Sequence, residues 1–123
     1  MCKMLLSINP CHVNNIMAGI KHYEFRKRKC KKIVDTIIIY ATSPIMKVVG
    51  EAEVIDIIED TPKNVWNVTS DYSGISKSFF DKYYKGREKA VAYKLGKVKK
   101  YEKPLSLSDL GVYSAPQSFV YIN

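Results

Sequence analysis

Residues 19–26 read Gly-Ile-Lys-His-Tyr-Glu-Phe-Arg, a G-x-K-x-x-E-x-R pattern in which a turn glycine precedes three charged residues. If this stretch ends in a β-strand, Glu24 and Arg26 share one face, because alternate side chains of a strand point the same way. Tyr23 and Phe25 then share the opposite face, which is predicted to be buried. Lys21 comes just before the strand, so the pattern predicts a small polar pocket lined by these three charges. The alternative is an exposed set of ion pairs, which contributes roughly 0–1 kcal/mol.

The residues before this stretch predict a strand and a helix that lead into it. Residues 3–8 form a strand-length apolar run. Asn9 and Pro10 are typical of an N-cap and a first helical position. Apolar residues then recur at helical spacing up to Ile20, and Gly19 can end the helix. The amino end of such a helix is suited to an anion such as phosphate.

The remaining elements follow in an irregular order of strands and helices. Helices are predicted to start at Thr61 and Ser76, a bulge is expected near Gly50, and a hairpin is expected around Gly96. The order predicts one α+β domain spanning residues 1–123, a small mixed barrel of about six strands with two or three flanking helices. Further strands are predicted at residues 23–28, 36–40, 47–58, 88–95, 97–103 and 118–122.

Composition limits where the chain works and what it can hold. The 123 residues contain no signal peptide and no apolar run near the roughly 20 residues of a membrane span, which predicts a cytoplasmic protein without a membrane partner. Cys2, Cys11 and Cys30 have no repeated spacing, which favours reduced thiols over disulfides or a zinc site. There is also no glycine-rich phosphate loop or dinucleotide fingerprint, so we expect neither a metal nor a cofactor.

The net charge of +8 is distributed unevenly. Residues 1–32 carry an excess of seven positive charges, residues 33–75 an excess of five negative charges, and residues 76–123 an excess of six positive charges. A barrel could bring the two basic ends together, and such a surface attracts RNA or nucleotides. The alternative is that the lysines serve solubility alone.

Two basic segments could extend the pocket. Six of the seven residues from 26 to 32 are basic, and several lysines between residues 94 and 103 alternate with tyrosines. Lysine can meet a phosphate while a neighbouring tyrosine stacks on a base. The predicted nucleic-acid or ligand site consists of Ser7, Lys21, Glu24, Arg26, Arg28, Tyr40, Ser43 and Lys94.

The octapeptide and its surroundings resemble the ASCH family, whose members adopt a PUA-like β-barrel. This resemblance implies RNA binding in a cleft lined by the signature residues, or, as in some small members, hydrolysis of N4-acylated cytidine. Besides residues 19–26, it rests on residues 5–10, 39–44, 74–86, 90–93 and 116–121.

Three functions therefore stay open. The first is an RNA- or nucleotide-binding module, with or without a regulatory role. The second is a small hydrolase of acylated cytidine or RNA, with Lys21 and Glu24 as its catalytic residues. The third is a protein-interaction module. The acylcytidine hydrolases carry a threonine, their proposed nucleophile, where this chain has Glu24, and this difference favours binding over catalysis.

Overall fold

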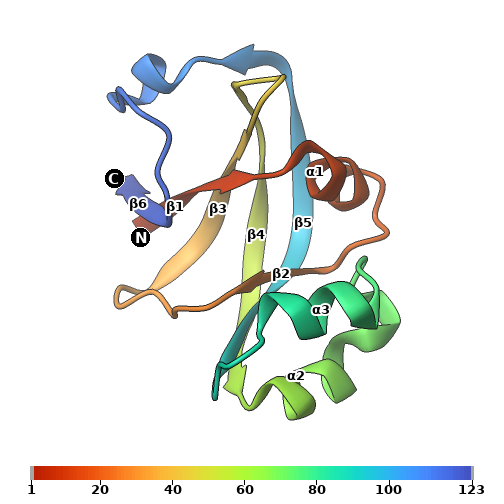
Figure 1. The fold of residues 1–123 in the computed structure, drawn as a ribbon. Coiled ribbons are helices and arrows are strands. Elements are labelled where there is room, and N and C mark those ends of the chain that lie inside the picture. Colours follow the sequence, from red (N-terminus) through yellow and green to blue (C-terminus); the bar gives the residue numbers. More distant parts are fainter. Residues whose placement is uncertain (1, 123) are drawn as a thin grey trace.

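The computed structural model describes residues 2–122 as a six-stranded mixed sheet with three α-helices and two short 3-10 helices (Figure 1). The fold is α+β, as predicted. Its elements in chain order are β1 (Cys2–Ile8), α1 (Pro10–Met17), β2 (Tyr23–Arg26), β3 (Val34–Ala41), β4 (Lys47–Asp60), α2 (Pro62–Thr69), η1 (Ser70–Tyr72), α3 (Lys77–Tyr83), β5 (Ala90–Leu105), η2 (Leu107–Leu110) and β6 (Phe119–Ile122).

The strands lie in the order β2-β5-β4-β3-β1-β6. Only β1 and β3 pair in parallel, and the other described pairs are antiparallel. The sheet curls so that β1 and β2 both run across the long strands in Figure 1, but no ladder joins β1 to β2. The expected barrel is therefore present in a loose sense only, because the sheet does not close.

The predicted helix starts are confirmed. Asn9 caps α1 by accepting a hydrogen bond from the Cys11 amide at 2.9 Å, and Thr61 and Ser76 cap α2 and α3 in the same way. After α1, Gly19 takes a φ of +76°, a conformation that glycine adopts without strain. This turn directs the chain straight into β2 and the signature residues.

The strand prediction was right about a bulge and wrong about a hairpin. The register of β4 shifts next to Gly50 against both neighbouring strands, as expected. Residues 96 and 97 do not turn, however, because β5 continues as one strand from Ala90 to Leu105. A Cβ at Gly96 would overlap the side chains of Glu53 and Ile55 on β4, so this glycine leaves room for two neighbouring side chains instead of forming a turn.

The sheet packs against three hydrophobic clusters. One lies between the curled sheet and α1, and another between the sheet and η2. The third joins Tyr23 and Phe25 of β2 to Val65 of α2 and to Phe80 and Tyr84 at α3. The predicted aromatic face of β2 is therefore buried. Within residues 2–122, no helix has the length and apolar character that crossing a membrane requires.

Candidate functional site

A cavity of about 160 Å³ opens between the end of β1, the start of α1, β2 and α3. One wall comes from residues 7–26 and the other from residues 75–83. The lining residues are Ser7, Ile8, Asn9, His12, Lys21, Glu24, Phe25, Arg26, Ile75, Phe79 and Tyr83. The three charged residues of the signature therefore reach one concave site, as their spacing predicts.

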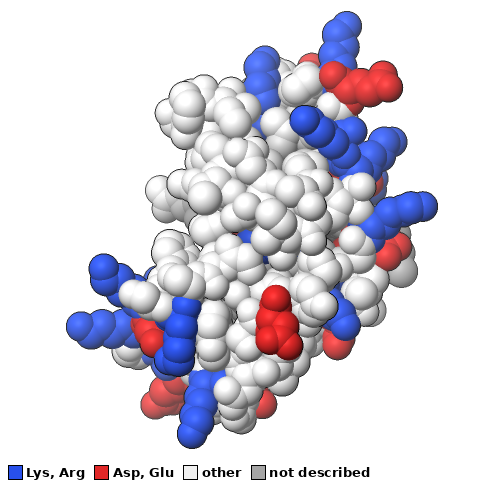
Figure 2. Space-filling view, turned by 90° about the vertical axis from the view of Figure 1, so that its right-hand side faces the viewer, with Lys and Arg blue, Asp and Glu red and all other residues white. Residues whose placement is uncertain are grey.

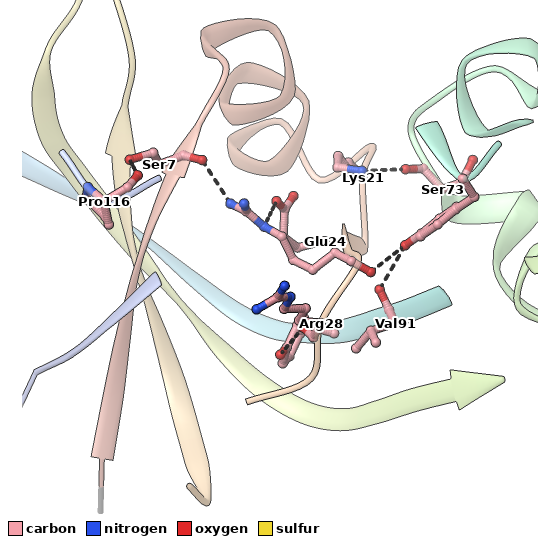
Figure 3. A network of polar contacts seen from close by, with 10 residues as sticks. Ser7, Lys21, Glu24, Arg28, Ser73, Val91 and Pro116 are labelled. Carbon is pink, nitrogen blue, oxygen red and sulfur yellow. Dashed lines mark hydrogen bonds and ion pairs between the residues drawn. The ribbon is translucent and has the colours of Figure 1, made fainter. Parts of the chain in front are cut away.

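Arg26 connects the two strands that border the cavity. Its Nε lies 3.1 Å from a carboxylate oxygen of Glu24, two residues back on the same face of β2. The angle is too poor for a hydrogen bond, so this contact is an ion pair. Its Nη2 donates to the carbonyl oxygen of Ser7 at 2.9 Å (Figure 3). Glu24 is only 7% exposed, and Arg26 therefore neutralises a buried carboxylate and fixes its position.

Lys21 is almost completely buried, with 3% of its surface exposed. Its Nζ donates to the Ser73 carbonyl oxygen at 3.0 Å and lies 4.6 Å from the centre of the Phe25 ring. Burial lowers the pKa of Lys21 to about 8, although the Glu24 carboxylate opposes this change. Gly74 packs directly on the lysine, and a Cβ there would lie 2.5 Å from the Lys21 Cβ. The loop between α2 and α3 thus holds the amine in place.

Four aromatic side chains in the cavity wall were not predicted as site residues, namely His12, Phe25, Phe79 and Tyr83. Phe79 meets the His12 ring edge-on at 5.3 Å and lies parallel to Tyr83 at 6.5 Å. The buried Nδ1 of His12 has no hydrogen-bond partner among residues 2–122. Burial and the nearby Lys21 lower the pKa of His12, against the effect of Glu24. The one available signal was the four-residue spacing of Phe79 and Tyr83, which places both on one side of a helix.

Four predicted site residues lie in the cavity wall, namely Ser7, Lys21, Glu24 and Arg26. Arg28, Tyr40, Ser43 and Lys94 do not. β2 ends at Arg26, so strand alternation does not extend to Arg28, which is exposed. Tyr40 is buried in the core, and Ser43 is exposed in the turn after β3.

The register between β5 and β2 places Lys94 outside the cavity. It lies opposite Tyr23 on β2, whereas Glu24 lies opposite Tyr93. Residues directly opposite each other in an antiparallel pair share a face, so Lys94 points to the side of the sheet away from Glu24. Its side chain is exposed there.

Positive charges are more numerous around the cavity than negative ones. Lys21 and Arg26 face the single carboxylate of Glu24 inside it. At the rim, the Nζ of Lys27 lies 4.7 Å from the centre of the Tyr83 ring, and Arg87 is near enough to act on the pKa of Tyr83. Burial nevertheless raises this pKa, so Tyr83 keeps its proton at neutral pH. The arrangement can hold an anionic group next to flat apolar surfaces.

Away from the cavity, the Lys and Arg side chains cluster on the surface. Figure 2 shows Lys and Arg side chains in two groups towards opposite ends of one face, with a mostly uncharged area between them. Within residues 2–122, no three His, Cys, Asp or Glu side chains come together as a metal site would require. The cations in the cavity wall itself are Lys21 and Arg26.

The sequence and the fold were compared with known proteins. The ASCH domain model matches residues 6–104. The large ribosomal subunit protein uL22 of Ureaplasma parvum is 36% identical over 97% of this chain, but the chain spans only 39% of that protein's length. An ASCH domain-containing ribonuclease of Zymomonas mobilis is 28% identical over 96% of this chain and 82% of its own length.

The solved structures agree with this match. The crystal structure of ASCH from Zymomonas mobilis superposes with a TM-score of 0.89, at 27% identity, over 98% of this chain and 87% of the other. The family model covers most of the chain, and the structural match extends over nearly all of it. The chain belongs to the ASCH domain family.

Proposed function

We propose that this chain binds single-stranded RNA, with one phosphate group held in the cavity beside Lys21 and Arg26. The observation that carries the proposal is the convergence of these two cations on one partly apolar cavity, next to a carboxylate that Arg26 already pairs. The charge of the whole chain, +8, also favours a polyanion. The Zymomonas mobilis relative whose name is that of a ribonuclease supports RNA as the polyanion.

The size and chemistry of the cavity suit a small part of an RNA strand. Its volume of about 160 Å³ lies below the roughly 300–1,000 Å³ of pockets for drug-sized ligands. A phosphate with part of its nucleotide is the matching unit. Lys21 and Arg26 would donate to phosphate oxygens, while Glu24 keeps Arg26 in position and can accept a hydrogen bond from an exocyclic amine. Ile75 and Phe79 supply apolar surface for a sugar or base.

RNA cleavage is the second candidate, and the lowered pKa of Lys21 favours it. A lysine with a pKa of about 8 is partly neutral near physiological pH and can accept a proton. RNA brings its own nucleophile, because a 2′-hydroxyl can attack the adjacent phosphorus while the 5′-oxygen leaves. The products would be a 2′,3′-cyclic phosphate and a 5′-hydroxyl. An acylated cytidine lacks such an internal nucleophile, and Ser7 in the cavity wall already donates its hydroxyl to the Pro116 carbonyl oxygen at 2.8 Å (Figure 3).

Fluorescence anisotropy with a labelled RNA of about ten unpaired nucleotides tests the proposal. Lys21→Ala should weaken binding at least tenfold, since a charge-assisted contact to phosphate is lost. Lys63→Ala is the matched control, because Lys63 is an exposed lysine of α2 and should leave affinity unchanged. Wild-type protein that binds no RNA, or equal effects of both substitutions, would contradict the proposal and favour a protein-interaction module.

The same samples distinguish binding from turnover. Cleavage that depends on Lys21 and stops on RNA with 2′-O-methyl groups would establish the second candidate. Release of free cytidine from the N4-acylated nucleoside would instead establish the amidohydrolase. Stable RNA throughout would leave binding as the activity.

A further inference from the structure

Helix α3 carries aromatic side chains on two adjacent faces. Phe80 and the following Tyr84 point into the core and are 1% and 3% exposed. Phe79 and Tyr83 line the cavity instead, and Phe79 is 47% exposed. The first pair accounts for the attachment of the helix to the sheet. In the second pair, Tyr83 still packs partly against the core and meets Tyr84 edge-on at 4.8 Å, whereas about half of the Phe79 surface faces solvent.

Phe79 and the half-buried Tyr83 form a regular strip with their neighbours. The rings of Phe79 and Tyr83 are 8° from parallel, with centroids 6.5 Å apart. His12 meets Phe79 at one end, and the Nζ of Lys27 lies over Tyr83 at the other. The strip therefore leads from the cavity to a cation at its rim. Alternating flat rings and cations are the features by which proteins hold unpaired nucleic acid.

We propose that Phe79 and Tyr83 form a base-stacking strip for single-stranded RNA. This inference rests on the proposed function and extends it beyond the phosphate in the cavity. The base next to that phosphate stacks on the exposed ring of Phe79, and Lys27 meets the following phosphate. Charge complementarity favours nucleic acid over an apolar protein segment, because the three cations Arg26, Lys27 and Arg87 near Tyr83 outnumber the single carboxylate of Glu24.

This arrangement implies selection for unpaired RNA. The bases of a duplex are stacked on one another and paired, so they cannot lie flat on an aromatic side chain. A single strand exposes a π-face at every base, which makes the strip tolerant of sequence. The chain should therefore prefer single strands strongly and distinguish the four bases weakly.

The test compares Phe79, which lines the cavity, with Tyr113, an exposed aromatic residue outside the cavity wall. Phe79→Ala should weaken binding of a ten-nucleotide single strand roughly ten- to a hundredfold, the effect of losing a stacked base. Phe79→Tyr should restore the affinity, because the ring returns. Tyr113→Ala is the control, since Tyr113 is 88% exposed and lies outside the cavity wall, and it should have no effect.

A second measurement uses RNA that lacks the bases. An abasic strand with the same number of phosphates should bind wild-type protein and the Phe79→Ala variant equally, because neither can stack on it. If Phe79→Ala binds normal RNA as tightly as wild type while Lys21→Ala does not, the strip is wrong and the proposed function stands. If wild-type protein binds no RNA, both are wrong, and a protein ligand becomes the explanation of the exposed ring.

Discussion

The Arg26 guanidinium donates to the Ser7 carbonyl oxygen across a distance of 2.9 Å and so connects β2, an edge strand of the sheet, to the end of β1. One side chain thus joins two strands that no backbone ladder joins. The same side chain neutralises Glu24 and faces the cavity. The residue best placed to hold a phosphate is therefore also a structural connection between two strands.

Removing this connection should destabilise the fold. Arg26→Ala removes a charge-assisted hydrogen bond and leaves Glu24 buried without its cation, which should lower the free energy of unfolding by about 2–4 kcal/mol. Adding Glu24→Gln to that variant should recover part of the loss. Urea unfolding at pH 7 measures both. Lys77→Ala is the control, because it breaks the exposed Lys77–Asp81 pair and should change stability by less than about 0.5 kcal/mol. Equal losses from the two single variants would contradict the role given to Arg26.

Lys21 should lower the stability of the fold at neutral pH. Its pKa falls from 10.5 to about 8, so the folded protein carries the charged amine at a cost of about 3 kcal/mol at pH 7. Lys21→Met removes that cost and also the hydrogen bond to Ser73, so we expect a net gain of about 1–2 kcal/mol. RNA binding should be at least tenfold weaker in the same variant, because the charge-assisted contact to phosphate is lost.

The free energy of unfolding should depend on pH through Lys21. Between pH 8 and pH 10.5 the unfolded chain binds more protons at Lys21 than the folded chain does, so this lysine destabilises the fold less as pH rises. The stability difference between Lys21→Met and wild type should shrink over this window. A constant stability difference would show that folding does not lower the pKa of Lys21.

As the pH rises, RNA affinity should begin to fall at a lower pH than it would if Lys21 had the pKa of an ordinary lysine. Protonated Lys21 attracts the phosphate, and it loses its proton as the pH rises through about 8. The dissociation constant should increase several-fold between pH 7 and pH 9, with a limit of about tenfold per unit above the pKa. His12 and Tyr83 do not interfere, because the lowered pKa of His12 and the raised pKa of Tyr83 keep both neutral in this range. Anisotropy with an RNA of adenosine and cytidine measures the effect, and Lys21→Met should show no step.

Gly74 should matter through the side chain that it touches. Gly74→Ala introduces a Cβ 2.5 Å from the Lys21 Cβ and also forces a non-glycine residue to a φ of +70°. Gly111→Ala is the matched control, with a φ of +74° and no atom within 4 Å of the added Cβ. Both should cost about 1–2 kcal/mol for the left-handed backbone. Only Gly74→Ala should also weaken RNA binding; loss of binding in both variants would contradict this.

The salt dependence of binding should report a small number of phosphate contacts. A footprint of about three to five contacts gives a slope of roughly −2 to −3.5 in log K against log salt for single strands. Lys27→Ala should make the slope shallower by about 0.7, the value of one phosphate contact. Lys63→Ala should leave the slope unchanged. Titrations between low and moderate salt measure the slopes. A flat dependence would exclude a mainly electrostatic mode of binding.

Short-range signals in the sequence predicted much of the fold and four of the eleven residues that line the cavity. Caps such as Asn9 and Thr61 depend on neighbouring residues only, so helix starts could be read directly. The convergence of Glu24 and Arg26 followed from strand alternation, which is equally local. Alternation failed at Arg28 because it holds only while the strand lasts, and β2 ends two residues earlier.

The other errors concern contacts between distant segments. His12 and Phe79 come from separate helices, and no periodicity within either one indicates that they meet. Glycine is typical of turns, but Gly96 lies within the continuous β5 and leaves room there for two side chains of β4. The side to which Lys94 points depends on its register against β2, which alternation within β5 alone does not define.

The sheet register has a consequence for how such a site can change. Asp60, the last residue of β4, pairs with Ala90, the first residue of β5. Residues 61–89 therefore leave the sheet and return to it at adjacent points, and they supply Ile75, Phe79 and Tyr83 to the cavity wall. The charged residues of that wall all come from residues 21–26. Replacing the segment between the two strands would exchange the stacking surface, but the replacement would also have to supply a carbonyl oxygen in the place of Ser73, which holds Lys21.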